Sequence, residues 1–304
     1  MVWIIIIIAL ILLYILLSFL FFIFITNVKI PGPYKLINNK IEEVIKPYKN
    51  IYEDAAKWLR SKPKKEVNIK SKDGLRLHGI MLENPKAKGV ILLAHGYRST
   101  KERDVYAGAK NYYNMGLSIL FIDQRCCGKS EGKYITFGVK ESEDINEWIK
   151  YLRKNYKNKN IFLGGISLGA TSVLLVNNPH VKAIVADSGF TSGWDEIKYC
   201  LKHYFYLPGF LFMPMINVFA KKIAKYNLKA KKTFDNLSKL NIPILFIHGN
   251  ADDFVPTDNC VKNYEHYKGP KEILIIDGAQ HGMSFLIDPE TYLKTIKEFL
   301  KDYL

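Results

Sequence analysis

The five consecutive residues Gly165-Ile166-Ser167-Leu168-Gly169 have the spacing G-x-S-x-G. They follow a short apolar run, Ile161 to Leu163, and precede a helical pattern from Ala170 to Val176. A tight turn from strand to helix exposes the serine hydroxyl, and glycines beside it let neighbouring backbone approach closely. The pattern predicts that Ser167 is a nucleophile at the C-terminal edge of a sheet.

A serine hydroxyl needs a general base to become nucleophilic. His281 lies in a loop directly after the late apolar run Ile273 to Ile276, which makes it the expected base. His248 also ends a predicted strand, and we interpret it as the start of the loop that delivers an acid. The other histidines lack such a setting and are expected to be structural or surface residues: His78, His180, His203 and His266.

The base needs a carboxylate that orients it. Asp252 and Asp253 follow the predicted strand Ile244 to Ile247, and Asp187 follows an earlier one. We choose Asp252 as the acid, and expect Asp253 to cap the helix that begins near Thr257 or Asp258. The chain order serine, aspartate, histidine is the order of doubly wound hydrolases.

Acyl transfer also requires backbone N–H groups that hold the negative charge on the substrate oxygen. Leu168 follows the nucleophile at a helix N-terminus and supplies one such group. Tyr97, in the His95-Gly96-Tyr97 loop after a buried strand, is expected to supply the second. This chemistry needs no cofactor, so we predict none and no metal.

Short apolar runs alternate with helical patterns over most of the chain, which predicts a mostly parallel, doubly wound α/β sheet with helices on both faces. A hairpin around Asp73-Gly74 precedes the first buried run. The runs expected as strands are Glu66 to Lys70, Leu75 to Leu82, Val90 to Ala94, Ser118 to Ile122, Ile161 to Leu163, Val181 to Ala186, Ile244 to Ile247 and Ile273 to Ile276.

One connection is too long for a plain loop and is rich in aromatic residues. We interpret residues 191–242 as an inserted helical cap. With it, residues 66–304 form the predicted catalytic domain.

Residues 1–28 are predicted to be a transmembrane anchor. No side chain from Val2 to Val28 is charged, and 24 helical residues would span about 36 Å, more than the roughly 30 Å of hydrocarbon. A cleavable signal peptide would carry a basic start and a small-residue cleavage site, which this segment lacks. Lysines follow the segment, starting at Lys29, so the positive-inside rule predicts a single-pass membrane protein with a cytoplasmic catalytic domain.

Residues 29–65 are expected to be a juxtamembrane connector. Apolar residues recur there at helical spacing from Ile41 to Leu59, interrupted by Pro47, after the helix-breaking Pro31-Gly32-Pro33. Such an amphipathic stretch either lies on the bilayer or packs on the main domain, and the sequence favours neither.

Composition fits this organisation. The chain has 304 residues, 48% of them hydrophobic, and a formal net charge of +15 from 44 Lys and Arg against 29 Asp and Glu. The lysines are dispersed and no nucleic-acid motif is present, so we expect an anionic lipid surface rather than nucleic acid as partner. Four cysteines lack disulfide or zinc spacing and are expected to be free thiols. The oligomeric state is left open.

From about residue 66 to its end, the chain resembles the α/β-hydrolase superfamily. The resemblance rests on His95-Gly96, the segment from Asp123 to Gly132, the G-x-S-x-G elbow, the segment from His248 to Pro256, and His281. Together these look like a membrane-anchored bacterial branch related to the Bem46-like serine hydrolases. The resemblance implies that Ser167, Asp252 and His281 form a triad, that Tyr97 and Leu168 form the oxyanion hole, and that residues 191–242 cover an acyl pocket.

One motif departs from the superfamily pattern. Where the family has Asp-x-Arg-Gly-x-Gly-x-Ser, this chain keeps Asp123 and Arg125 but carries Cys126-Cys127, which we expect to affect packing only.

The sequence therefore predicts a serine hydrolase of carboxylic acyl esters, similar to carboxylesterases and lipases, whose small-molecule substrate is hydrophobic. An amidase or peptidase resembling the prolyl oligopeptidase catalytic domain is the first alternative, because the same triad serves both leaving groups. A catalytically silent, membrane-tethered binding protein is the second, because fold alone does not imply function.

Overall fold

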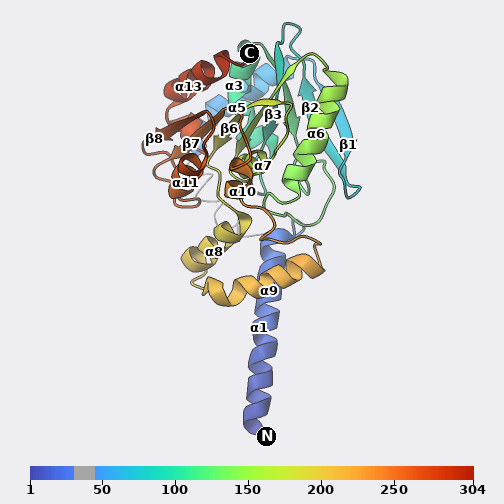
Figure 1. The fold of residues 1–304 in the computed structure, drawn as a ribbon, viewed down its shortest axis with the longest axis vertical. Coiled ribbons are helices and arrows are strands. Elements are labelled where there is room, and N and C mark those ends of the chain that lie inside the picture. Colours follow the sequence, from blue (N-terminus) through green and yellow to red (C-terminus); the bar gives the residue numbers. More distant parts are fainter. Residues whose placement is uncertain (31–44) are drawn as a thin grey trace.

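The computed structural model describes residues 1–30 and 45–304. Eight strands form one sheet in the order β1-β2-β4-β3-β5-β6-β7-β8 (Figure 1). The pairs β1–β2 and β2–β4 are antiparallel, and all the others are parallel. The strands are β1 (Lys65–Lys70), β2 (Arg76–Leu82), β3 (Gly89–Ala94), β4 (Leu117–Ile122), β5 (Asn160–Ile166), β6 (Val181–Asp187), β7 (Ile244–Gly249) and β8 (Lys271–Ile276).

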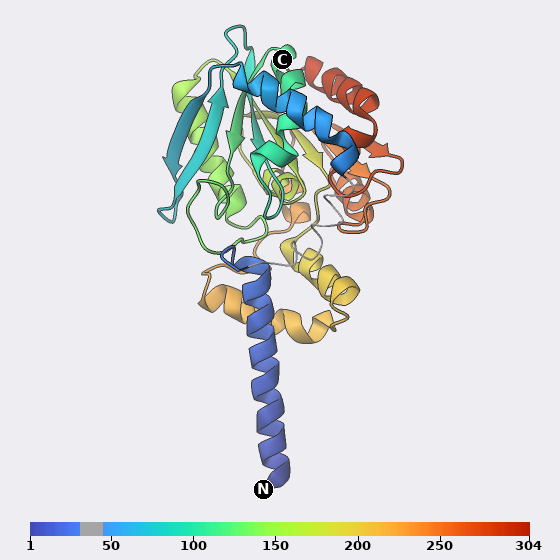
Figure 2. The ribbon, with the colours of Figure 1, turned by 180° about the vertical axis from the view of Figure 1, so that it is seen from behind.

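Helices cover both faces of the sheet. One apolar cluster packs α6, α7 and α11 on one face, and a second packs α3, α5 and α13 on the other (Figures 1 and 2). The helices around the sheet are α3 (Lys49–Arg60), α4 (Lys101–Asp104), α5 (Tyr106–Asn114), α6 (Glu141–Asn155), α7 (Leu168–Leu174), α11 (Asp258–His266), α12 (Ser284–Ile287) and α13 (Pro289–Lys301). The predicted doubly wound α/β architecture is confirmed.

The central strands are mostly apolar on both faces because helices exclude water from both sides of the sheet. Every residue of β3, β4 and β7 is buried. Strand β3 lies between β4 and β5, so the chain reverses its direction of winding there. Ligand sites of open α/β sheets lie beyond the strand ends at such a reversal. The loops after β3 and β5 therefore meet at one edge, and those loops carry Tyr97 and Ser167.

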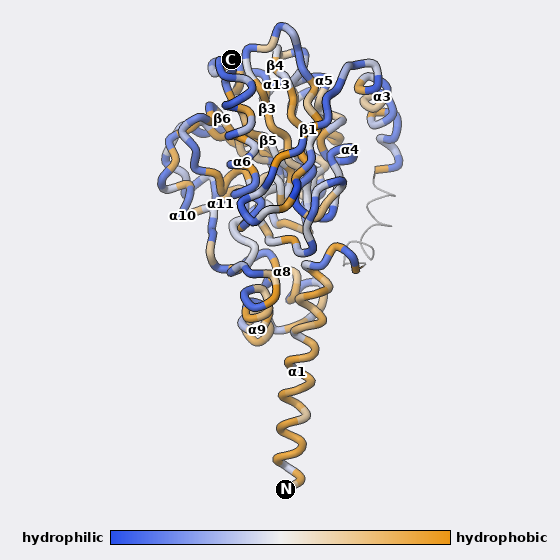
Figure 3. The backbone as a smooth tube through the Cα atoms, turned by 90° about the vertical axis from the view of Figure 1, so that its right-hand side faces the viewer, coloured by the Kyte–Doolittle hydropathy of each residue, from blue (hydrophilic) through white to orange (hydrophobic). Residues whose placement is uncertain are grey.

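Helices α8 (Gly193–Tyr204), α9 (Gly209–Lys222) and α10 (Thr233–Leu237) lie between β6 and β7. Below that sheet edge, α8 and α9 form a cap, and α1 (Val2–Thr26) leaves the cap as a long rod (Figure 1). A third apolar cluster joins the end of α1, the cap and the start of α7. Among the described residues, α1 alone is long and apolar enough to cross a bilayer, a test that an N-terminal signal sequence also passes. Figure 3 shows its hydrophobic character along its whole length.

The later part of the predicted connector packs on the domain. After the short 3-10 turn Lys46–Tyr48, α3 lies on α5, with the rings of Trp58 and Tyr113 5.4 Å apart. Figure 2 shows α3 on the sheet's outer face, away from α1. Residues 31–44, with Pro31-Gly32-Pro33, lie outside the described residues. The boundaries 1–28, 29–65 and 66–304 stay a prediction.

Candidate active site

Ser167 occupies a strained turn between β5 and α7. Its φ is +56° and its ψ is −118°, a conformation that L-residues rarely adopt. Two glycines make the turn sterically possible: a Cβ on Gly165 would overlap the backbone of Gly169, and a Cβ on Gly169 would overlap the carbonyl of Ala94. The Ser167 N–H donates to Asp187 O at 2.8 Å, which ties the turn to β6.

The structure brings Ser167, His281 and Asp252 together. His281 Nε2 lies 2.8 Å from Ser167 Oγ, so the hydroxyl can donate its proton to the ring. On the other side of the ring, Nδ1–H donates to Asp252 Oδ2 at 2.7 Å. These contacts join residues 114 and 29 positions apart, delivered by the loops after β5, β7 and β8. The alcohol, imidazole and carboxylate thus form one hydrogen-bonded chain, the arrangement that a proton relay requires.

Asp252 is held by both of its oxygens. Oδ1 accepts from the N–H groups of Phe254 at 3.0 Å and Val255 at 2.8 Å. Oδ2 lies 3.0 Å from His248 Nε2 as well as facing His281. His248 Nε2 is also 2.8 Å from Val255 O, so His248 braces the acid loop, as the sequence indicated.

The neighbouring carboxylates have other surroundings. Asp253 is exposed, and its backbone carbonyl accepts hydrogen bonds from Tyr199 at 3.0 Å and Tyr204 at 2.9 Å, both on α8. The prediction that Asp253 caps the next helix is wrong, since Thr257 occupies the N-cap position of α11 without a side-chain cap bond. Buried Asp187 accepts from Ser188 and Ser284.

Charge pairing sets the titration of the relay. Burial by itself would raise the pKa of Asp252, but His281 and His248 outweigh it and hold that pKa well below its usual range. Burial would lower the pKa of His281, but the charge and hydrogen bond of Asp252 raise it above its ordinary value. The aspartate therefore stays ionised wherever His281 is neutral and able to act as a base.

The predicted oxyanion donors lie beside the nucleophile. Leu168 is the first residue of α7, a position whose N–H has no acceptor within its own helix. The loop of Tyr97 passes close to Ser167, because a Cβ on Gly96 would be 3.3 Å from Ser167 Cβ. The Gly96 N–H donates to Asp104 Oδ2 at 2.6 Å, which fixes that loop. Both N–H groups can thus serve one substrate oxygen, although their role stays a prediction.

Sequence reasoning missed Arg98, which ties this loop to the end of α1. Its guanidinium donates to the carbonyls of Phe24 at 3.0 Å, Asn27 at 2.8 Å and Ile30 at 2.9 Å. The Tyr97 hydroxyl donates to Ile25 O at 2.6 Å. The carbonyls of Phe24, Ile25 and Asn27 lie at the C-terminal end of α1, and that of Ile30 lies just beyond it. No side-chain pattern in the sequence marks backbone acceptors of this kind.

Glu196 of α8 is a second residue that the sequence did not single out. It is buried in the cap, and burial raises its pKa to about 8 despite a weak hydrogen bond from the Cys200 thiol. The charge of Asp252 adds to this rise, and Glu196, when ionised, raises the pKa of His281. No motif in the sequence marks Glu196, because it lies within a helix among both polar and apolar residues.

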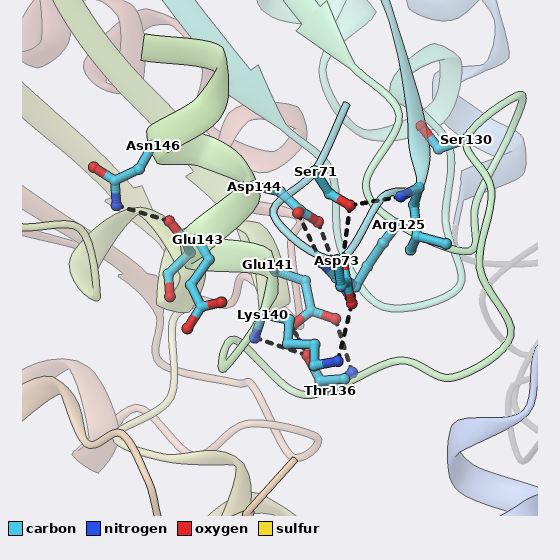
Figure 4. Close-up of polar contacts among 12 residues, drawn as sticks. Ser71, Asp73, Arg125, Ser130, Thr136, Lys140, Glu141, Glu143, Asp144 and Asn146 are labelled. Atoms are coloured by element: carbon cyan, nitrogen blue, oxygen red, sulfur yellow. Dashed lines mark hydrogen bonds and ion pairs between the residues drawn. The ribbon is translucent and has the colours of Figure 1, made fainter. Parts of the chain in front are cut away.

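The loop after β4, where the sequence departs from the family pattern, is a structural anchor (Figure 4). Buried Arg125 makes two bonds of 2.7 Å to Asp144 of α6 and reaches Asp73 of the hairpin turn at 3.1 Å. Burial raises the pKa of Asp144 to about 6, with Arg125 opposing the shift. Buried Asp123 likewise pairs with two basic side chains, Lys101 at 2.6 Å and His78 at 2.7 Å. Among the described residues, no three His, Cys, Asp or Glu side chains gather as a metal site would require.

Comparisons with known proteins find related hydrolases. Residues 47–229 match the family described as X-Pro dipeptidyl-peptidase (S15 family), a range that includes Ser167 but ends before Asp252. The chain is 26% identical over 267 residues to the uncharacterized protein YqkD of Bacillus subtilis, covering 85% of this chain and 86% of YqkD. It is 26% identical to the human alpha/beta hydrolase domain-containing protein 17B, over 73% of this chain and 69% of that protein.

Among solved structures, the esterase Pf2001 of Pyrococcus furiosus is similar, with a TM-score of 0.65 and 26% identity. The likeness covers 80% of this chain and 93% of the esterase.

Proposed function

We propose that this chain, which belongs to the X-Pro dipeptidyl-peptidase (S15) family of the α/β-hydrolase superfamily and is a serine-type hydrolase, cleaves carboxylic acyl esters. One observation carries the proposal: the relay in which His281 lies 2.8 Å from Ser167 Oγ and 2.7 Å from Asp252 Oδ2. The likeness to the esterase Pf2001 supports ester bonds over amides.

In the proposed mechanism, Ser167 Oγ attacks the acyl carbon while His281 Nε2 accepts its proton. The N–H groups of Leu168 and Tyr97 hold the oxyanion, and Asp252 stabilises the imidazolium. His281 then gives the proton to the leaving alcohol oxygen, and an acyl-serine forms. Water, activated by His281, breaks that acyl bond by the same route and restores the serine hydroxyl.

The site sits under an apolar cap, which supports a hydrophobic acyl group of the kind that lipases accept. We also propose that α1 is a single-pass anchor in the cell membrane, that the catalytic domain is cytoplasmic, and that the chain represents a branch related to the Bem46-like hydrolases. The uncharged length of α1 and the lysines that follow it support the placement.

The test is labelling with a fluorophosphonate, which reacts with activated serines, followed by turnover of p-nitrophenyl esters of increasing acyl length. Ser167→Ala should lose all labelling and turnover, whereas Ser238→Ala, at an exposed serine, should keep both. Labelling that survives in Ser167→Ala would overturn the assignment of the nucleophile. A wild-type chain with neither labelling nor turnover would favour a silent binding protein.

The family match supports a second candidate, hydrolysis of a peptide bond after X-Pro, because the same relay can expel an amine. The ratio of kcat/KM for p-nitrophenyl esters to that for X-Pro p-nitroanilides decides between them. We expect the ester to be preferred by far more than its higher intrinsic reactivity explains.

A further inference from the structure

Cap helix α9 lies directly against the rod of α1. The rings of Tyr14 and Phe212 are 5.8 Å apart, those of Phe19 and Phe219 are 5.3 Å apart, and the Tyr14 hydroxyl donates to Leu211 O at 2.8 Å. Both ribbon views show α9 running across α1 well before the rod reaches the sheet (Figures 1 and 2). The depth of α9 relative to α1 is thereby fixed.

That depth conflicts with a cap surrounded by water. Tyr14 lies about 18 Å along the axis from Val2, and Phe22, which packs near Phe219, lies about 30 Å along it. The hydrocarbon layer is about 30 Å thick. If α9 stayed outside it, the stretch of α1 from Tyr14 onward would lie in water as well, and the exposed side chains of Leu16, Leu17 and Leu20 would be left uncovered.

The outer face of α9 is built for lipid. Phe210 is 80% exposed, and Leu211, Pro214 and Val218 continue the same face, while Phe212, Met213 and Ile216 turn inward. Tyr206, in the turn before α9, is 88% exposed. The helix ends in exposed Lys221 and Lys222, which suit the headgroup layer. In water this apolar face would stay uncovered.

We propose that α9 and the α8–α9 turn are immersed in the hydrocarbon of the bilayer leaflet that faces the catalytic domain. The occupant of the exposed face is the bilayer itself, and the proposal rests on α1 being the membrane anchor. The third apolar cluster runs without a break from Phe22 of α1 through Phe212 of α9 to Leu168 beside the nucleophile. The cluster links the proposed lipid-facing helix to the site, so the substrate class that fits is an ester dissolved in the membrane.

A depth measurement tests the proposal without needing catalysis. The full chain, reconstituted in phosphatidylcholine vesicles, carries a nitrobenzoxadiazole fluorophore on Phe210→Cys, with Lys157→Cys and Leu10→Cys as references. Lys157 is exposed before β5, at the far end of the strands from the cap, and Leu10 is exposed on α1. Burial raises the pKa of the native thiols Cys127 and Cys260 to about 12, which slows their labelling, and the wild-type chain treated in parallel gives the background to subtract.

Lipids brominated on the acyl chains should quench the labels at Phe210→Cys and Leu10→Cys, and aqueous iodide should quench only that at Lys157→Cys. Quenching of the Phe210→Cys label by iodide, with Leu10→Cys quenched by bromolipid, would overturn the proposal and leave the anchor intact. A Phe210→Cys label that neither agent reaches would indicate a second copy of the chain on this face, and would also overturn it.

A second variant measures the consequence for substrate. Val218→Asp places a charge on the proposed lipid face and should lower turnover of a long-chain ester in vesicles by about 10-fold or more. Turnover of soluble p-nitrophenyl acetate should be unchanged, as in the matched control Lys157→Asp. Equal turnover of the vesicle-bound ester by Val218→Asp and wild type would contradict immersion. Loss of both activities in wild type would instead point to failure of the proposed esterase function.

Discussion

Replacing Asp252 with Asn tests the relay at its carboxylate. The adjacent Asp253 has different surroundings and provides the comparison. Both oxygens of Asp252 accept hydrogen bonds: Oδ1 from two backbone N–H groups at 2.8 and 3.0 Å, and Oδ2 from His281 at 2.7 Å. An amide has one acceptor oxygen, so its NH₂ must face a donor on one side. If the NH₂ faces His281, the ring must carry its proton on Nε2, and Nε2 can no longer accept the proton of Ser167.

The alternative orientation opposes the amide to two backbone donors and costs about 1–3 kcal/mol for each group left without an acceptor. The orientation with the NH₂ facing His281, which moves the ring proton to Nε2, therefore costs less free energy. We expect Asp252→Asn to lower kcat by about 10⁴-fold, which corresponds to roughly 5.5 kcal/mol of transition-state stabilisation, with a folded protein by circular dichroism.

Asp253→Asn is the matched control. Asp253 meets the cap through its backbone carbonyl, which the substitution leaves in place, so kcat should change by less than about 2-fold. Both variants are measured on a short p-nitrophenyl ester. If Asp253→Asn loses as much activity as Asp252→Asn, or if Asp252→Asn stays within about 10-fold of wild type, the assignment of the acid is refuted.

Three further predictions follow from the same geometry. Since Asp252 raises the pKa of His281 above its ordinary value, kcat/KM should fall as the pH drops through a single ionisation above about 6.5, and a pH profile with that limb below 6.5 would contradict this. Arg98→Met removes three hydrogen bonds to backbone carbonyls at and just beyond the end of α1, about 3 kcal/mol, and one to the Tyr97 hydroxyl. It should lower kcat for a soluble ester by about 10-fold or more, up to the 10²- to 10³-fold typical for loss of one oxyanion donor, and an unchanged kcat would show that α1 does not support the loop. Gly169→Ala drives a Cβ into the backbone of Ala94 and should destabilise the fold by more than about 3 kcal/mol in thermal denaturation, whereas Gly108→Ala, where a Cβ meets nothing, should be neutral or stabilising.

The strands and the elbow were predictable because their signals are local. A run such as Val90 to Ala94 is apolar on every residue only if both faces of the strand are covered, and β3 does have both faces buried. The glycines around Ser167 mark close backbone approach, which the overlap at Gly165 and Gly169 demonstrates. The loop positions of Asp252 and His281 followed from strand ends, since parallel strands deliver their following loops to one edge.

What the sequence could not predict concerns contacts that leave no local signal. The order of strands, with β4 outside β3, depends on pairing across the sheet and not on any one segment. Whether α3 met lipid or protein depended on α5, whose Tyr113 faces Trp58. Asp253 looked like a helix cap by type and spacing, but the tyrosines of α8 hold its backbone in a different place. Competing tertiary contacts decided each case.

The bond between Arg98 and α1 changes what the anchor does physically. The last carbonyls of a helix carry the negative end of its dipole and have no partners within the helix. Arg98 supplies a positive charge and donors to that end, while its neighbour Tyr97 contributes the predicted oxyanion N–H. A tether that served only to restrict diffusion would need no such joint, since a flexible linker holds a domain at a membrane equally well. If α1 is the proposed membrane anchor, a rigid joint at this loop fixes the tilt of the site relative to the bilayer, and the geometry of the predicted oxyanion hole then depends on α1 being in place.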